Sequence, residues 1–472
     1  MSWNFEPELT HVEGLKQRAR HSVRQEPREV VRLSIAGALA SAFAAYRVWQ
    51  ATVGVPGEWQ DSADYHRIAA TPGWFARDIW AGERPPLVPF LLKVVGNRAD
   101  DYLLLQVLIG AACWLVLAWA FAQLVRPGWG RIAIEVAVLG TGLSRPIVQW
   151  DRQVLGETTS IAAAVLFLAA LMYFARRGSW LAAVGVLSSA VVFAAARDTH
   201  VMVVAACAGA ATVVLAIRVW NDRPVRATLS ALAAGLAVIA ALGWAGITAA
   251  GRDGSAHMAN IMATRIFPYP ERLDWFAGHG MPQADEIRAV EPAFIEDIGI
   301  LYLWIDPNAP DFPEYGAWLD GPAAGTYTQW LIQHPGYVFS EPLKSPERAT
   351  NNAHGDLSFY ASPDRDDIPA LTEILFPSRA WLAAIGVAGA SVIVAFRLGR
   401  RRPDLLVAVG MVPLGLAHML ASWHADGMET MRHALVGNIQ IRLGVLALGI
   451  AGAAAAGSRI KRTRCTTSRT AR

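Results

Sequence analysis

Blocks of apolar residues, each about long enough to cross a membrane, recur along most of this chain between short charged segments. A helix of roughly 20 apolar residues spans the ~30 Å hydrocarbon core of a bilayer. Only 17% of the residues are charged, whereas soluble globular proteins carry about 25%. We therefore predict an all-α polytopic membrane protein with about ten transmembrane helices. The expected helices cover residues 33–52, 100–125, 131–148, 156–175, 179–196, 200–219, 227–249, 379–397, 403–422 and 435–457.

The connections between these blocks fall into two sets that alternate along the chain. One set is rich in arginine and contains Arg126, Arg131, Arg176, Arg177, Arg218, Arg223, Arg226, Arg397, Arg400, Arg401 and Arg402. The positive-inside rule assigns this set to the cytoplasm. The other set, residues 53–99, 149–155, 197–199, 250–378 and 423–434, is then expected outside. The basic tails, residues 1–32 and 458–472, both join the cytoplasmic set, which agrees with an even number of crossings.

The compartment follows from composition and from the ends of the chain. The basic stretch before the first apolar block lacks the short apolar core and small-residue cleavage site of a signal peptide, so we expect it to be retained. High Ala, Arg and Gly content is typical of a GC-rich bacterial genome. We therefore expect a multi-pass protein of the bacterial plasma membrane with both termini in the cytoplasm.

The domain organisation is read from the same pattern. An N-terminal transmembrane module (33–250) contains a long first outer loop (53–99), and a C-terminal group of transmembrane helices occupies 379–457. Between them, residues 251–378 form a large extracytoplasmic loop domain. Residues 251–376 carry 19 acidic and 7 basic side chains, a formal charge of −12. Their aromatic content argues against disorder and favours short packed helices.

The first outer loop contains a pair of carboxylates with the spacing of one helical turn. Asp61 and Asp64 are three residues apart, so a helix would place both on one face. A carboxylate near the low-dielectric membrane can have a raised pKa and serve as a general base. The alternative is that Asp61 and Ser62 form the N-cap of an interfacial helix. The apolar stretch 84–96 is too short to span and is expected to lie at the interface or to re-enter partway.

Further charged residues cluster at helix ends on the same expected side of the membrane as Asp61. They are Asp151, Arg152, Glu157, Arg197, Asp198, His200, Arg432, His433 and, further into the last helix, Arg442. Ionisable groups at membrane depth are costly and usually face a cavity or a partner. Their common side predicts one polar cavity, in which arginine forks suit a lipid-linked phosphate. The alternative is that these groups pair with each other or with lipid headgroups.

Several function classes lack their signatures in this sequence. There is no Walker GxxxxGK[ST] loop, no HExxH and no GxSxG. The basic residues are confined to short loops and tails, which is unlike a nucleic-acid binder. The three cysteines, Cys113, Cys207 and Cys465, show no CxxC or Cys/His metal spacing and are interpreted as small fillers. No metal site or required cofactor is predicted, although the acidic outer loop offers ligands for a divalent cation.

The first outer loop, read as QDSADYHRIA followed by WAGERPPLVPFLLKVVG, resembles the GT-C superfamily of multi-spanning glycosyltransferases. In that family the loop carries an acidic residue in a DSxxY-like context and then an (R/H)PP segment. Asp61, Tyr65, Arg84, Pro85 and Pro86 match these positions. The residue before Asp61 is Gln60, where the family often has glycine.

Three later stretches extend the resemblance in the same order along the chain. WDRQVLGETTSIAAAVLF is similar to the family's helix that opens with Glu, and Arg152 and Glu157 carry the match, with Gly156 in place of the usual serine. AAARDTHVMVV places Arg197 like an arginine between paired helices. DGMETMRHALVGNIQIRLG resembles the closing motif of actinobacterial-like members through Glu429, Arg432 and His433.

The resemblance implies an inverting transfer of a sugar from a polyprenyl-phosphate donor to an extracytoplasmic glycan, lipid or protein acceptor. Asp61 would be the catalytic base, with Asp64 as the second choice. Tyr65, Arg84, Arg152, Glu157, Arg197, His200, Arg432 and His433 would bind donor phosphate and substrate. Two alternatives remain: a transporter or flippase for a lipid-linked or polar substrate, and a non-catalytic membrane protein that binds the cell envelope.

Overall fold

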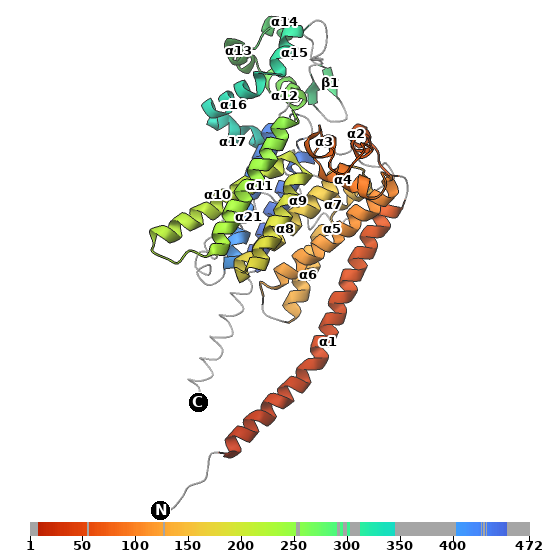
Figure 1. The fold of residues 1–472 in the computed structure, drawn as a ribbon, viewed down its shortest axis with the longest axis vertical. Coiled ribbons are helices and arrows are strands. Elements are labelled where there is room, and N and C mark those ends of the chain that lie inside the picture. Colours follow the sequence, from red (N-terminus) through yellow and green to blue (C-terminus); the bar gives the residue numbers. More distant parts are fainter. Residues whose placement is uncertain are drawn as a thin grey trace, which may run out of the picture.

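The computed structural model describes residues 8–53, 56–125, 128–251, 255–289, 293–295, 300–302, 312–344, 403–425, 427, 430 and 432–450. Long helices run side by side in one bundle, and a smaller group of short helices stands at one end of it (Figure 1). We call this end the loop side, because residues 56–98 and the described residues between 255 and 344 lie there. The N-terminal part of α1 (Glu8–Thr52) projects from the opposite end.

Six helices within the described part of the chain are long and apolar enough to cross a membrane. They are Glu29–Thr52 of α1, α5 (Ala99–Ala122), α8 (Glu157–Arg177), α10 (Asp198–Trp220), α11 (Ala227–Ala249) and Arg432–Ile450. The helices expected at 179–196 and 403–422 are present as α9 (Trp180–Ala196) and α21 (Pro403–Ala425). The helix expected at 379–397 lies outside the described residues. The chain therefore has several spans, and the count of ten stays a prediction.

The helix expected at 131–148 is broken into pieces. α6 (Trp129–Gly142) ends, and after two residues α7 (Arg145–Val148) and the 3₁₀ turn η1 (Gln149–Arg152) continue at an angle of 51°. Pro146 stands in the first turn of α7, where its missing N–H costs nothing. The residue that interrupts the helix is Ser144, the N-cap of α7, whose backbone is extended. The chain thus restarts as a short helix whose end brings Asp151 and Arg152 back toward α8, and with the break counted as one span the total is seven.

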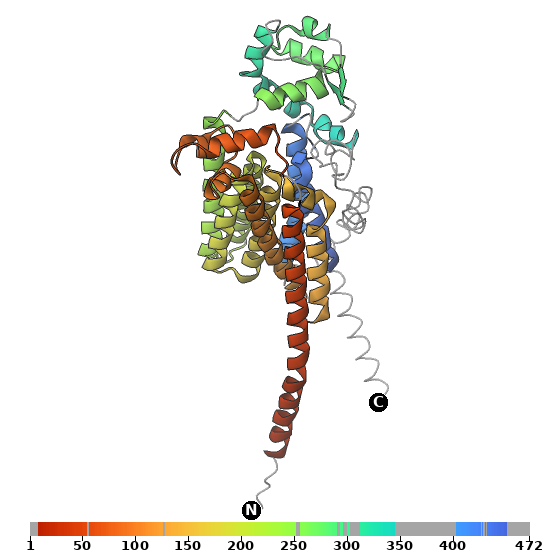
Figure 2. The ribbon, with the colours of Figure 1, turned by 90° about the vertical axis from the view of Figure 1, so that its right-hand side faces the viewer.

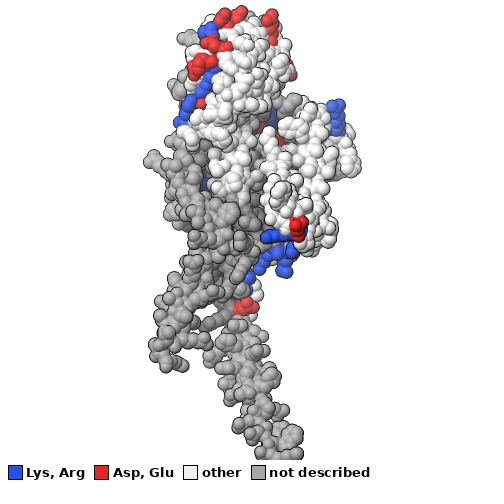
Figure 3. Space-filling model, turned by 90° about the vertical axis from the view of Figure 1, so that its left-hand side faces the viewer, with Lys and Arg blue, Asp and Glu red and all other residues white. Residues whose placement is uncertain are grey.

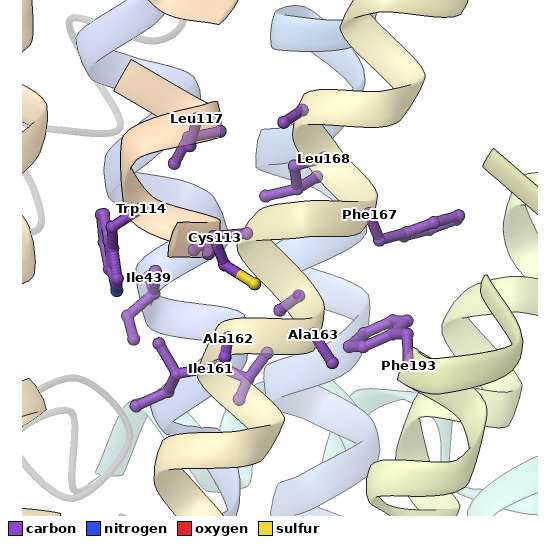
Figure 4. Packing of buried hydrophobic residues seen from close by; sticks show 14 of the residues in the cluster. Cys113, Trp114, Leu117, Ile161, Ala162, Ala163, Phe167, Leu168, Phe193 and Ile439 are labelled. Carbon is purple, nitrogen blue, oxygen red and sulfur yellow. The ribbon is translucent and has the colours of Figure 1, made fainter. Parts of the chain in front are cut away.

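The core of the bundle is tightly packed around α5 and α8. Leu117 of α5 and Leu168 of α8 lie side by side in Figure 4, and Trp114 of α5 packs against Gly142 of α6; all of these residues are buried. The rings of Phe167 and Phe193 stack 5.4 Å apart and join α8 to α9. Cys113 is a free thiol buried within this core, as expected for a small apolar filler.

The loop domain is mostly helical. Its helices are α12 (Ser255–Ile261), the π-helical turn η2 (Met262–Ile266), α13 (Pro270–Gly278), α14 (Ala284–Arg288), α15 (Pro313–Leu319), α16 (Ala323–Gln333) and α17 (Pro335–Lys344). A small hairpin, in which β1 (Ala293–Ile295) pairs antiparallel with β2 (Ile300–Tyr302), was not expected from the sequence. The domain has an apolar core of its own, separate from that of the bundle.

Arg265 and Tyr327 of the loop domain contact the end of α21 and the segment that follows it. Arg265, in the π-helical turn, donates to the carbonyl of Trp423 and, over 3.0 Å, to the hydroxyl of Thr430. The hydroxyl of Tyr327 lies 3.1 Å from Nδ1 of His424. The loop domain is thus anchored close to the start of the helix that carries Arg432.

Charge is distributed unevenly along the long axis of the molecule. Figure 3 shows acidic side chains gathered over the loop domain and basic side chains near the opposite end of the bundle. The connections at that opposite end contain Arg176, Arg177, Arg218, Arg223 and Arg226. This is the asymmetry on which the positive-inside argument rests.

Candidate functional site

The first outer loop folds into three short helices at the loop side: α2 (Gln60–Ala69), α3 (Arg77–Ala81) and α4 (Leu87–Val94). α2 lies across the end of the bundle in Figure 2. Its N-cap is Trp59, so the alternative that Asp61 and Ser62 form the N-cap is wrong. Ser62 instead accepts a hydrogen bond from the Trp59 N–H through its hydroxyl, over 2.9 Å. Asp61 is left in the first turn, where the helix dipole favours an acidic side chain.

The start of α2 is held in place by main-chain contacts with the segment before α8. The N–H of Gly57 donates to the carbonyl of Arg152 over 2.8 Å, and the N–H of Val154 donates back to Gly57 over 2.9 Å. Ser62 adds a hydroxyl bond of 2.8 Å to the Val154 carbonyl. A Cβ on residue 57 would lie 1.9 Å from Oε1 of Gln153, so a larger residue there would displace the Gln153 side chain.

Both oxygens of Asp61 are paired with arginines from distant parts of the sequence. Oδ1 lies 2.8 Å from a terminal nitrogen of Arg84, and Oδ2 lies 3.0 Å from a terminal nitrogen of Arg432. Arg84 also binds Asp64, over 2.7 Å and 3.2 Å. The two carboxylates therefore do share one face of α2, as their spacing predicts, and Arg84 bridges them.

Glu157, at the first position of α8, joins the same group from the other side. Its Oε1 accepts a hydrogen bond from Nε of Arg432 and another, over 3.0 Å, from Arg197. Arg197 is the residue between α9 and α10. The structure thus brings together six residues that the sequence singles out, in the order Asp64, Arg84, Asp61, Arg432, Glu157 and Arg197. We call this row of alternating charges the charge chain.

The charge chain runs from the protein interior to its surface. The side chains of Glu157 and Arg432 are 1% and 4% exposed, whereas those of Asp61 and Arg84 are 24% and 30% exposed. Its three carboxylates balance its three guanidinium groups. The buried end is therefore held by neutralised, charge-assisted hydrogen bonds. The open end presents a carboxylate and an arginine to the surroundings.

Ionisation at the open end follows from this pairing. Burial tends to raise the pKa of Asp64, but hydrogen bonds and charges of Arg84 and Arg67 outweigh it and leave that pKa below its ordinary value. Asp64 is therefore a poor proton acceptor. Tyr65, buried beneath the pair, has its pKa raised to about 12 by burial and then by the charge of Asp61. Tyr65 therefore stays a neutral phenol at physiological pH.

Three predicted site residues are placed differently. His200 is buried against Phe193, with its ring 4.0 Å from the phenyl ring and its Nδ1 2.9 Å from the Phe193 carbonyl. His433 has its ring 5.9 Å from that of His257, at the foot of the loop domain. The main-chain carbonyl of Arg152 accepts a hydrogen bond from the N–H of Gly57. Glu429, the remaining residue of the closing motif, lies outside the described residues.

A buried ion pair beside the site was only half anticipated. Arg47 of α1 binds Asp151 through two nitrogens, one of them at 2.8 Å, and their side chains are 1% and 0% exposed. Thr158 donates to Asp151 as well, over 3.2 Å. Asp151 was noted as a charge at a helix end, but Arg47 was overlooked. Its signal was available, because an arginine inside an apolar block requires a buried partner.

Metal binding has no geometric candidate among the residues that the structure describes. Nowhere in those ranges do three side chains from His, Cys, Asp and Glu converge as ligands. The carboxylates of the site point at arginines instead. A cavity of about 520 Å³ lies between α10 and α11, and it is lined by Val201, Met202, Ala205, Ala240, Ala241 and Trp244.

Comparison with known proteins gives no relative. No protein-family model matches the chain, and no curated protein matches it at a significant level. The site therefore has to be interpreted from its own geometry and from the motif resemblance of its sequence.

Proposed function

We propose that this protein is a membrane glycosyltransferase that moves a sugar from a polyprenyl-phosphate donor to an acceptor on the loop side. The observation that supports this most is the charge chain, in which Asp61 lies between two arginines at the rim of a bundle of apolar helices. A reaction on a lipid-linked phosphate needs a base and cationic groups at the membrane surface. The motif resemblance to the GT-C superfamily leads to the same chemistry, with a glycan, lipid or protein as acceptor.

Donor binding would begin with an exchange of partners at Arg84. This arginine is the most exposed member of the charge chain and is shared by two carboxylates. A phosphate offers oxygens that match the guanidinium fork as well as a carboxylate does. Arg84 can turn to the donor phosphate while Asp64 and Asp61 keep it close. Arg432 is anchored by buried Glu157, so it would hold its position during the exchange.

The transfer itself would use the oxygen of Asp61 that Arg84 releases. Asp61 takes the proton from the acceptor hydroxyl as the acceptor oxygen attacks the anomeric carbon of the sugar. The bond between that carbon and the phosphate oxygen breaks, and the lipid phosphate leaves with the bonding electron pair. Arg84 and Arg432 stabilise its growing negative charge. One displacement of this kind inverts the anomeric centre.

The orientation in the membrane is part of the proposal. The arginine-rich connections at the end opposite the loop domain would face the cytoplasm. The loop domain and the charge chain would then face outside, and the donor would be used from the outer leaflet of a bacterial plasma membrane. No divalent cation is required by this scheme, because the leaving group is already a phosphate.

The test is turnover by the purified full-length protein with a panel of polyprenyl-phosphate sugars and envelope extract as acceptor. Loss of a general base lowers the rate by about 10²–10⁴-fold, so we expect Asp61→Asn to abolish detectable transfer. Asp78→Asn is the matched control, since Asp78 lies in the same loop on α3, is exposed and is not a member of the charge chain. That control should transfer sugar at the wild-type rate.

The opposite results would point elsewhere. Wild-type turnover in Asp61→Asn would remove Asp61 from the role of base. If folded wild-type protein binds a donor lipid but transfers nothing, the proposal fails. Movement of that lipid between leaflets of a reconstituted vesicle would then favour a flippase.

A further inference from the structure

The turn between α2 and α3 exposes aromatic side chains to an unusual degree. Phe75 is 91% exposed, Trp74 is 51% exposed and Trp80 is 44% exposed. A chain in water seldom groups large apolar side chains on its surface unless the patch contacts another molecule or a membrane. We call these three residues the aromatic tip.

The aromatic tip has a defined conformation. Gly73 has a φ of +85°, which lets the chain reverse between Pro72 and Trp74. The indole N–H of Trp80 donates to the carbonyl of Trp74 over 2.9 Å. Both indoles also contact Phe90 of α4, with ring centroids 6.1 Å and 5.7 Å apart. The exposed rings are therefore presented by a built turn that is braced against α4.

The elements next to the aromatic tip indicate that lipid contacts it. α3 packs against α11, which is one of the helices able to span the membrane. α11 carries exposed Leu242 and Trp244 toward its loop-side end. The apolar surface of the tip thus continues the lipid-facing surface of the bundle. Exposed Arg77, two residues after Phe75, suits a lipid phosphate, and tryptophan favours the boundary between headgroups and acyl chains.

We propose that the aromatic tip inserts into the lipid leaflet on the loop side and sets the height of the first outer loop above the membrane. The bound partner is the lipid surface itself. Asp61, Asp64 and Arg84 belong to the unit formed by α2, α3, α4 and their connections. Within this unit, Lys93 of α4 donates to the Ala69 carbonyl at the end of α2 over 3.1 Å. The depth of Phe75 therefore fixes the level of the open end of the charge chain. That this height helps the charge chain to bind a donor phosphate rests on the proposed function, whereas insertion of the aromatic tip does not.

Insertion can be measured without any enzyme assay. Cys113→Ala, Cys207→Ala and Cys465→Ala give a cysteine-free chain, to which Phe75→Cys is added for a nitroxide label. The labelled protein is placed in nanodiscs of phosphatidylcholine and phosphatidylglycerol. Collision of the label with oxygen, which concentrates in lipid, is compared with collision with a water-soluble nickel complex. Leu242→Cys on α11 serves as the lipid reference, and Asp285→Cys, at a side chain that is 92% exposed on the loop domain, serves as the water reference.

We expect the Phe75→Cys label to match Leu242→Cys, with high oxygen and low nickel accessibility. A label as accessible to nickel as Asp285→Cys would overturn insertion. The height-setting role has a second readout at Glu83→Cys, beside Arg84. Replacing Phe75 by Ser in that background should shift the Glu83→Cys label toward nickel. If the shift is absent, the tip does not set the height of the loop. Both readouts stand whether or not the protein transfers sugar.

Discussion

Two ion-paired regions lie within a few residues of each other on the 149–157 segment, yet they are built for different purposes. The Arg47–Asp151 pair is sealed inside the bundle, with both side chains essentially unexposed. The charge chain begins as deeply, at Glu157, but ends at the surface with Arg84. Both regions use arginine and carboxylate. The difference is whether a member of the group has solvent access and a second possible partner.

The buried pair holds its helices together, whereas the exposed pair can exchange one partner for another. A buried pair that loses one member leaves an uncompensated charge, so its partners are fixed. A pair at the surface gains little from any one partner and can trade it for another at small cost. The charge chain combines the two, because its buried half holds Arg432 still while its exposed half is free to meet a ligand.

The largest expected effect comes from breaking the sealed pair. Arg47→Met strands Asp151 in the bundle and should reduce the free energy of unfolding by about 3–5 kcal/mol. We expect the variant to be recovered poorly in detergent and to melt at a lower temperature. The double variant Arg47→Met with Asp151→Leu removes both charges and should recover much of the loss. If Arg47→Met alone is as stable as wild type, the pair does not stabilise the fold.

The next effect comes from cutting the charge chain at its centre. Arg432→Gln separates Asp61 from Glu157 and removes a donor from the leaving phosphate. Loss of one such donor costs about 10²–10³ in turnover number. Transfer rates with a polyprenyl-phosphate sugar, measured beside melting temperature, check this. A fall in stability with unchanged turnover per folded molecule would show that Arg432 stabilises the fold and does not act in transfer.

The smallest effect concerns a third pair, in the loop domain, where Arg272 holds Glu341 through two contacts of 3.0 Å. Burial tends to raise the pKa of Glu341, but Arg272 and Lys344 outweigh it and lower that pKa below 4.5. The folded state therefore binds this proton less readily than the unfolded chain. The stability that the pair adds is complete above pH 4.5 and is lost as the pH falls further through the lowered pKa.

Thermal melts across acidic pH check this dependence. Glu341→Gln should flatten the acid limb of the curve while changing little at neutral pH beyond a constant offset. An identical acid limb in the variant would assign the acid sensitivity to other carboxylates.

The sequence predicted where the charges meet but not how they pair. Glu157, Arg197 and Arg432 lie far apart in sequence and were expected to share one polar cavity, and the structure joins them by ion pairs. Which carboxylate each arginine binds depends on the rotation of the helices about their axes, and loop charges carry no information on that rotation. For the same reason His200, the third residue of α10, points into the core against Phe193 instead of joining the charge chain.

Helix existence was predicted better than helix continuity. Long apolar blocks such as 100–125 and 227–249 appear as α5 and α11. The block at 131–148 carries Arg131, Glu135 and Arg145, and its helix is interrupted at Leu143 and Ser144. Hydropathy averages over such local backbone preferences. The β1–β2 hairpin of the loop domain was not predicted either, since its three-residue strands are too short to show an alternating pattern.

The bridge between Gly57 and Arg152 has a consequence for how this protein can vary. Main-chain hydrogen bonds hold the loop at this bridge. Side chains near the bridge can therefore be exchanged without displacing Asp61. Ser62 is needed for its hydroxyl bond to Val154, and a side chain at residue 57 would displace Gln153. The first outer loop therefore combines a main-chain anchor with side chains that can be exchanged. Variants that keep Gly57, Ser62 and the members of the charge chain, and change the exposed residues between them, are the natural starting library for altering what this surface accepts.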